Sequence, residues 1–225
     1  MLCVFYISLH FLLQNCPYLN YKEVIKMNIK ESETNLNLMR AFAGECQARN
    51  RYTFAAETAK KNKLFVVEAI FKFTADEELA HAEVFYDSLK SSAGSTIKTD
   101  GGYPIDISDS VVQLLRYAAH NEYQEHDDVY KSFGDKAQEE GFPEIAACFH
   151  NIAEIEKRHG ARFTELADLL EQNKLFIADA ECEWMCLNCG HILSAKEVPA
   201  VCPVCKHDRG YFIRLSMSPY HFGSA

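Results

Sequence analysis

The chain has 225 residues, a formal net charge of −9 and a hydrophobic fraction of 48%. This length suits one medium domain with a small module, and the hydrophobic fraction supports a packed core, which excludes wholesale disorder. The acidic balance argues against a nucleic-acid partner, because neutralising phosphates requires a basic face.

Residues 1–26 form an N-terminal extension that begins with a largely apolar run, MLCVFYISLHFLL. The run is too short to span a membrane, and it lacks the positive leader and cleavage site of a secretory signal. We interpret Met27 as the true initiator and residues 1–26 as a mis-assigned start. The alternative is a tail with weak membrane association. The sequence otherwise predicts no membrane partner.

Four segments carry apolar residues at helical spacing, namely residues 31–61, 63–91, 108–140 and 143–173. Ser108 and Asp109 are candidate N-caps of the third segment. Gly141 predicts the end of that helix and Pro143 the start of the next. The Gly-, Ser- and Thr-rich residues 91–106 are expected to cross the length of the bundle. Two hairpins joined by one long crossover are typical of a ferritin-like four-helix bundle.

Both hairpins carry a lone glutamate followed by a Glu-x-x-His motif, with 33 residues between the two glutamates in the first hairpin and 34 in the second. The motif residues are Glu45, Glu78 and His81 in the first hairpin and Glu122, Glu156 and His159 in the second. Residues three apart lie on one helix face, so each Glu-x-x-His pair can reach a single ion. Buried carboxylates need neutralising cations, and this donor set suits iron, manganese or zinc.

A single Glu-x-x-His motif is more typical of a solvated helix face than of a metal site. Its duplication, within apolar surroundings, favours a pair of metal ions held between the hairpins. Glu77 and Glu154 also neighbour the motif residues. We expect their side chains to point about 100° or more away around the helix, and therefore not toward the metals.

Residues 179–217 form a separate, turn-rich module, followed by a tail at residues 218–225. The module contains two C-x-x-C pairs, whose cysteines are Cys186, Cys189, Cys202 and Cys205. Two such pairs form a tetrahedral four-sulfur site for zinc or iron, and a module this small needs a metal to fold. Spacing alone favours a zinc ribbon, whereas a redox bundle upstream favours iron. The odd total of nine cysteines indicates reduced thiols in a cytoplasmic protein.

Four motifs together closely resemble the rubrerythrin family across about residues 27–215. These are AFAGECQARNRY, the run around Glu78-x-x-His81, EEGFPEIA leading to Glu156-x-x-His159, and WMCLNCGH with CPVC. The resemblance implies an all-α ferritin-like four-helix bundle over residues 27–178. It implies that the bundle is followed by a small rubredoxin-like metal-bound β/turn domain.

The resemblance also implies a function in oxidative stress defence, the reduction of hydrogen peroxide to water at a di-iron site. Electrons would pass through a rubredoxin-type iron, supplied from NAD(P)H by a separate reductase or rubredoxin, and the chain would form a homodimer. The implied di-iron ligands are Glu45, Glu78, His81, Glu122, Glu125, Glu156 and His159. Glu78 and Glu156 would bridge the irons, and Glu125 would exchange with His81. Tyr52 and Tyr130 would donate hydrogen bonds beside the site.

Two other functions are compatible with parts of the sequence. Iron storage would use the same bundle but would not need a four-cysteine module as a built-in electron port. A zinc ribbon would make the module a site of interaction. Metal analysis separates these functions, because the redox interpretation requires three irons per chain.

Overall fold

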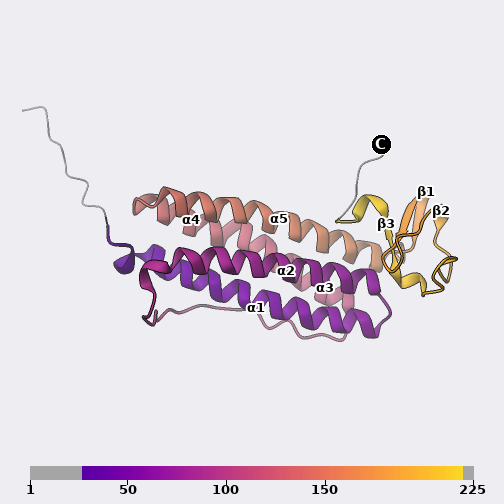
Figure 1. The fold of residues 1–225 in the computed structure, drawn as a ribbon, viewed down its shortest axis with the longest axis horizontal. Coiled ribbons are helices and arrows are strands. Elements are labelled where there is room, and N and C mark those ends of the chain that lie inside the picture. The colour runs from indigo at the N-terminus through magenta and orange to yellow at the C-terminus, as the bar shows by residue number, and fades with distance from the viewer. Residues whose placement is uncertain (1–26, 220–225) are drawn as a thin grey trace, which may run out of the picture.

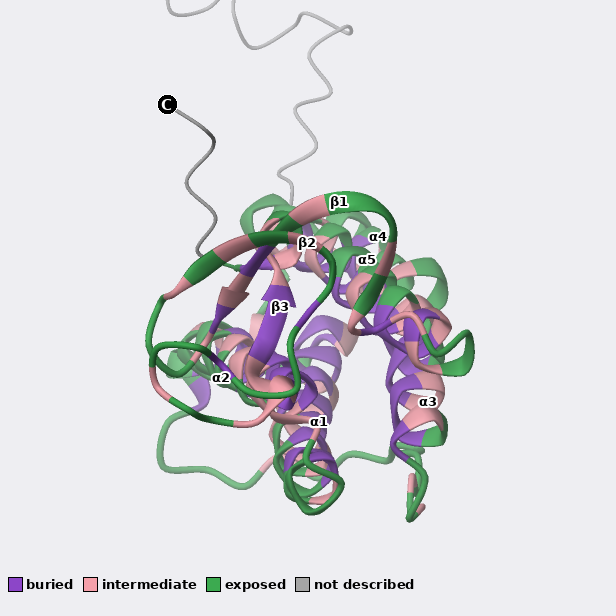
Figure 2. Cartoon of the chain, turned by 90° about the vertical axis from the view of Figure 1, so that its right-hand side faces the viewer, coloured by how far each residue is buried: buried purple, intermediate pink, exposed green. Residues whose placement is uncertain are grey.

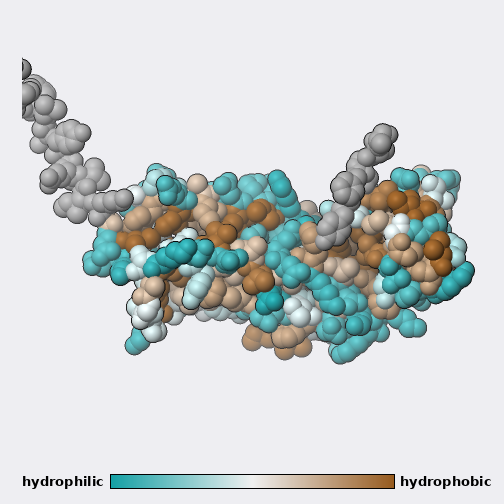
Figure 3. All heavy atoms as spheres, viewed as in Figure 1, coloured by the Kyte–Doolittle hydropathy of each residue, from teal (hydrophilic) through white to brown (hydrophobic). Residues whose placement is uncertain are grey.

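The computed structural model describes residues 27–219, in a long helical bundle with a small β module at one end (Figure 1). The predicted extension at residues 1–26 and the final residues 220–225 lie outside the described part of the chain. No helix within residues 27–219 is long and apolar enough to cross a membrane. Polar side chains interrupt the apolar ones over the face drawn in Figure 3.

The bundle consists of two helical hairpins, as predicted. The first hairpin pairs α1 (Glu33–Lys61) with α2 (Phe65–Ser88), and the second pairs α3 (Val111–Gln124) and α4 (Tyr130–Glu139) with α5 (Pro143–Glu171). The connection from α2 to α3 is the expected long crossover, which runs along α1 in Figure 1. Gly141 has a φ of +85°, and Pro143 is the first residue of α5, so both predicted boundary residues are confirmed.

The segment expected to form one helix over residues 108–140 is interrupted. It begins at Val111, where the N-cap is Ser110 and not Ser108 or Asp109, because the Ser110 hydroxyl accepts the N–H of Gln113. A π-helical turn, Glu125–Val129, then separates α3 from α4. A π turn accommodates one extra residue within a continuous helix. This extra residue accounts for the spacing of 34 in the second hairpin against 33 in the first.

The N-terminus of α1 is capped by a side chain from the other hairpin. The N–H groups of Glu33 and Thr34 donate to the Glu140 carboxylate over 3.0 and 2.8 Å, and the Thr34 hydroxyl donates to it over 2.6 Å. An anion is favourable there, because the first N–H groups of a helix have no partner within the helix. Glu140 therefore fixes the end of α4 against the start of α1.

The apolar core of the bundle has two parts, one on each side of a buried polar centre. Near the module, Phe71 and Phe163 pack with ring centroids 5.1 Å apart. At the other end, Phe85 and Phe149 pack with centroids 5.0 Å apart. Figure 2 shows the buried segments on the faces that the helices turn toward one another. Aromatic packing on both sides keeps the centre between the clusters away from bulk water.

The module is a three-stranded antiparallel sheet of order β2-β1-β3, built from β1 (Ile177–Cys186), β2 (Ile192–Glu197) and β3 (Phe212–Arg214). It docks on the bundle where α1 turns into α2. Tyr211 stacks on Phe65 with centroids 4.2 Å apart. A Cβ atom added at Gly210 would lie 2.0 Å from the carbonyl oxygen of Lys63, so only glycine fits at this contact.

Candidate metal centres

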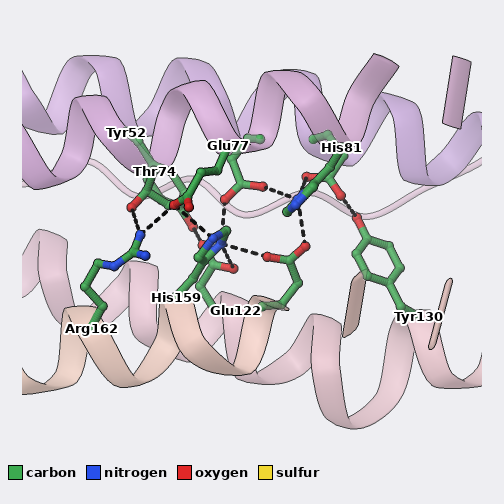
Figure 4. A network of polar contacts seen from close by, with 11 residues as sticks. Tyr52, Thr74, Glu77, His81, Glu122, Tyr130, His159 and Arg162 are labelled. Atoms are coloured by element: carbon green, nitrogen blue, oxygen red, sulfur yellow. Dashed lines mark hydrogen bonds and ion pairs between the residues drawn. The ribbon is translucent and has the colours of Figure 1, made fainter. Parts of the chain in front are cut away.

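The six residues of the duplicated motif meet in the interior of the bundle, at the centre drawn in Figure 4. Four elements supply them: α1, α2, α3 and α5. The four glutamates are at most 1% exposed and the two histidines at most 7% exposed. The helical spacing therefore places all six side chains inward, as predicted from the repeat.

These side chains form two overlapping groups. One comprises Glu45, Glu78, His81 and Glu156, and the other comprises Glu78, Glu122, Glu156 and His159. Within each group, the potential ligand atoms lie within 4.8 Å of one another. Two of the glutamates, Glu78 and Glu156, belong to both groups.

Each histidine directs the same nitrogen toward the two shared glutamates. Nδ1 of His81 lies 3.2 Å from Glu78 and 3.0 Å from Glu156. Nδ1 of His159 lies 3.1 Å from Glu78 and 2.8 Å from Glu156. The two rings are nearly parallel, with centroids 5.7 Å apart. The centre therefore has a pseudo-two-fold arrangement that follows the sequence repeat.

The donor set fits a pair of divalent cations. Five buried carboxylate oxygens have no hydrogen-bond partner within the described residues: Oε2 of Glu45, Oε1 of Glu78, Oε2 of Glu122 and both oxygens of Glu156. Buried polar atoms are normally satisfied, and several buried carboxylates together are unfavourable without positive charge. Two metal ions would satisfy these oxygens and neutralise the cluster.

The electrostatics of these buried groups also favour bound cations. Burial, together with repulsion from Glu78 and Glu156, raises the pKa of Glu45 and Glu122 well above 4.5. Burial alone would lower the pKa of His81, but its contacts with Glu156 and Glu78 raise that pKa to about 10. In the metal-free chain, protons therefore occupy the place of cations, and metal binding must release them.

Two tyrosines cross between the hairpins to the lone glutamates. Tyr130 donates a hydrogen bond to Oε1 of Glu45 over 2.5 Å, and Tyr52 donates to Oε1 of Glu122. Burial and the neighbouring carboxylates raise the pKa of both phenols well above 10. Both tyrosines therefore remain protonated donors at neutral pH.

Glu125, the remaining predicted ligand, belongs to neither group in this structure. It is half-buried at the start of the π turn, and it lines a cavity of about 820 Å³. The cavity lies between α1, the crossover and the α3–α4 segment, and its lining also includes Gly44, Tyr103 and Tyr130. The cavity thus reaches the tyrosine that contacts Glu45.

One contact of a neighbouring glutamate was not predicted. Glu77 belongs to neither ligand group, as expected, yet its Oε2 lies 3.2 Å from the outer nitrogen, Nε2, of His159. The rotation of about 100° from Glu78 turns Glu77 toward α5, where Arg162 donates to the same oxygen over 2.6 Å. Glu154, in contrast, is exposed, as predicted, and contacts His126. Arg162 lies three residues after His159, on the same face of α5, and this spacing could have indicated an ion pair with Glu77.

The module brings the four predicted cysteines together. Their sulfur atoms lie within 4.8 Å of one another, with 3.7 Å between Cys186 and Cys205 and 3.7 Å between Cys189 and Cys202. None of these four cysteines forms a disulfide. This set fits a tetrahedral four-thiolate site for iron or zinc. The Cys189 side chain is exposed, so the site reaches the molecular surface.

Comparison with known proteins decides the family. The rubrerythrin family model matches residues 37–167, and the model of the rubrerythrin rubredoxin-like domain matches residues 184–213. The chain belongs to the rubrerythrin family. It is 42% identical to the rubrerythrin of Clostridium perfringens, over 82% of this chain and 95% of that protein. It is 39% identical to the rubrerythrin of Porphyromonas gingivalis, over 86% of this chain and 96% of that protein.

A solved structure agrees with this assignment. The fully reduced, all-ferrous nigerythrin superimposes with a TM-score of 0.56 at 26% identity, covering 90% of this chain and 95% of that chain. The family and the two kinds of ligand group together give this rubrerythrin-family chain a di-iron site in the bundle and a rubredoxin-like iron site in the module. The resemblance inferred from the sequence motifs is thereby confirmed, as is the ferritin-like bundle followed by a rubredoxin-like module.

Proposed function

We propose that this chain is an oxidoreductase that reduces hydrogen peroxide to water in defence against oxidative stress. The observation that carries the proposal is the pair of overlapping carboxylate–histidine groups in a water-excluded bundle, on the same chain as a four-cysteine site. When bound, the paired irons would supply electrons and Lewis acidity for cleavage of the O–O bond. The protein would position the substrate and provide its protons.

The proposed di-iron ligands are the seven residues predicted from the motifs: Glu45, Glu78, His81, Glu122, Glu125, Glu156 and His159. Glu78 and Glu156 are proposed as bridges because both ligand groups share them. Glu125 is proposed to alternate with His81. Its position outside both groups, while His81 lies inside one, supports this proposal.

The cavity is the proposed route by which peroxide reaches the centre. It extends from the crossover to Glu125 and Tyr130, and the missing side chain at Gly44 leaves room along α1. Reducing one peroxide to two waters consumes two protons. The Tyr130 hydroxyl donates a hydrogen bond to Glu45, and both Tyr130 and Glu125 line the cavity. We assign the relay of these protons to the two groups, with Tyr52 holding Glu122 in place.

The module is the proposed point of electron entry, with Cys186, Cys189, Cys202 and Cys205 as ligands of its iron. The exposed Cys189 supports docking of a separate donor, either rubredoxin or an NAD(P)H-linked reductase. Within one chain, the module contacts the end of the bundle through Tyr211 and Phe65 and not the buried glutamates. A cytoplasmic homodimer, in which one subunit's module approaches the other's di-iron site, would supply a shorter electron path.

The decisive test combines metal analysis with a ligand variant. We expect three irons per chain. Two irons with one zinc would instead indicate that the module is a structural zinc ribbon. In anaerobic stopped-flow experiments, peroxide should oxidise the reduced wild-type protein rapidly. Glu125→Ala should react more slowly and retain the visible spectrum of the four-cysteine iron. Unchanged turnover in this variant would contradict the role of Glu125.

A further inference from the structure

We propose that Glu77 is a positioning residue that fixes His159, and that no residue within 27–219 plays the same part for His81. The two irons would then be held unequally, with ligand exchange confined to the His81 side. The inference rests on the proposed di-iron function, because it concerns how this chain supports the ligands of that site. Glu77 itself does not contact the shared carboxylates and acts through the histidine ring.

The proposed lock consists of Thr74, Glu77 and Arg162, which lie beside His159 in Figure 4. Oε2 of Glu77 lies 2.6 Å from Nη1 of Arg162 and 3.2 Å from Nε2 of His159. The same guanidinium nitrogen donates to the Thr74 hydroxyl over 2.8 Å. Arg162 is further confined by the ring of Phe73, with the guanidinium carbon 5.1 Å from the ring centroid. The Glu77 carboxylate is thus fixed from one side and faces the imidazole on the other.

The Glu77 carboxylate lies within ion-pair distance of Nε2 of His159, although the pair does not have hydrogen-bond geometry. Its negative charge favours a proton on Nε2, which leaves the lone pair of Nδ1 directed toward Glu78 and Glu156. An outer carboxylate also fixes the plane of the ring and makes the ligating nitrogen more basic. His159 is therefore pre-organised as a strong and permanent metal ligand.

The sequence repeat shows that this support is one-sided. A shift of 78 residues superimposes Glu78 on Glu156 and His81 on His159. The same shift pairs each lock residue with an apolar one: Thr74 with Ile152, Glu77 with Ile155, and Arg162 with Val84. Within residues 27–219, every polar contact of His81 uses Nδ1. No described side chain fixes the other nitrogen of His81.

This asymmetry distinguishes the two histidine ligands. His81 has no described outer partner whose contact must break when it leaves a metal, whereas His159 must break its contact with Glu77. Glu125, the proposed replacement ligand, also has no counterpart in the first hairpin, because the shift of 77 residues that superimposes Glu45 on Glu122 pairs it with Ala48. The lock and the alternate ligand are therefore two departures from the repeat that together confine exchange to one iron.

The test compares Glu77→Leu and Glu77→Gln with wild type, and uses Glu154→Gln as the matched control. Glu154 also neighbours a motif residue, but its side chain is exposed and contacts His126 and not a ligand histidine. Anaerobic titration of the metal-free protein with Co²⁺ measures the two bundle affinities separately. Mössbauer spectra during a redox titration of the ⁵⁷Fe-loaded protein measure the potential of each iron. Neither readout depends on turnover.

We expect Glu77→Leu to weaken one bundle ion by about 10–100-fold, leave the other unchanged and raise the potential of one iron only. Glu77→Gln keeps the side-chain shape and should give a smaller change in the same direction. If the leucine variant does not fold, the glutamine variant tests the role of Glu77 by itself. Wild-type values in the glutamine variant, or equal weakening of both ions, would overturn the lock. A wild-type protein that binds no metal pair would instead overturn the proposed function.

Discussion

Tyr130 of α4 donates a hydrogen bond over 2.5 Å to Glu45 of α1, and thereby joins the two hairpins at the metal centre. Tyr52 of α1 makes the reciprocal contact with Glu122 of α3. In each pair the phenol satisfies Oε1, while Oε2 of the same glutamate has no hydrogen-bond partner among the described residues. The tyrosines therefore orient each lone glutamate so that one oxygen is available for a cation.

Replacing Tyr130 with phenylalanine should impair both the fold and the reaction. The change leaves a buried carboxylate oxygen unpaired, which costs about 1–3 kcal/mol of unfolding free energy. It also removes a proton donor beside the cavity, so oxidation of the reduced protein by peroxide should slow. Urea unfolding and anaerobic stopped-flow measure the two effects. Tyr86→Phe, at a position that is 61% exposed, is the control. A Tyr130→Phe variant with unchanged stability and rate would refute the role of the phenol.

Filling the cavity at Gly44 should hinder peroxide without altering the metal sites. A Cβ atom there would lie 3.9 Å from Cε1 of Tyr103 and 4.0 Å from the Tyr130 hydroxyl, which is ordinary contact. Gly44→Ala should therefore behave as wild type, whereas Gly44→Leu should extend into the cavity and slow oxidation by peroxide. The comparison uses stopped-flow rates with iron content measured on the same samples. Equal rates in all three proteins would place the entry route elsewhere.

The ligand groups were accessible from sequence because they follow the period of a single helix. Glu78 and His81 lie three residues apart on one face, and the same spacing recurs at Glu156 and His159. The repeat then requires the faces to meet, since neither hairpin alone can bury three polar side chains favourably. The apolar residues around each motif indicated that the helix face carrying the glutamates and histidines is buried.

The π turn and the contact of Glu77 were not predicted, for two different physical reasons. A π turn inserts one residue without changing composition or amphipathicity, and the only trace of it was the unequal spacing between Glu45–Glu78 and Glu122–Glu156. The Glu77 side chain leaves the motif face of α2, but α5 covers the direction in which it points. Periodicity along one helix cannot show which neighbouring helix lies opposite.

The contact at Gly210 should control how the module docks. Gly210→Ala places a methyl group 2.0 Å from the Lys63 carbonyl, and such an overlap forces a displacement that costs about 1–3 kcal/mol. The module should separate from the bundle while each retains its metal, so limited proteolysis should cleave the connection near residues 172–177 faster. Gly102→Ala, where nothing lies within 4 Å, is the control. Wild-type resistance to proteolysis would contradict a tight fit at this contact.

The cap that Glu140 provides to α1 makes part of the stability depend on pH. Burial opposes ionisation of Glu140, but hydrogen bonds from Thr34 and Glu33 outweigh it and hold the pKa below 4.5. A carboxyl group whose pKa is lower in the folded state stabilises the fold above its unfolded pKa. That contribution is lost as the pH falls through the folded value.

Glu140→Gln should therefore lower the free energy of unfolding by about 1–2 kcal/mol at neutral pH, since the variant loses a charged cap of a helix N-terminus. The difference from wild type should shrink as the pH falls below about 4.5, where the unfolded carboxyl takes up its proton, and should vanish below the folded pKa. Urea unfolding across this range measures it. Glu139→Gln is the control, because Glu139 is exposed and pairs with Lys136 and not with the N-terminus of α1. A difference that stayed constant with pH would show that Glu140 stabilises α1 by its shape and not by its charge.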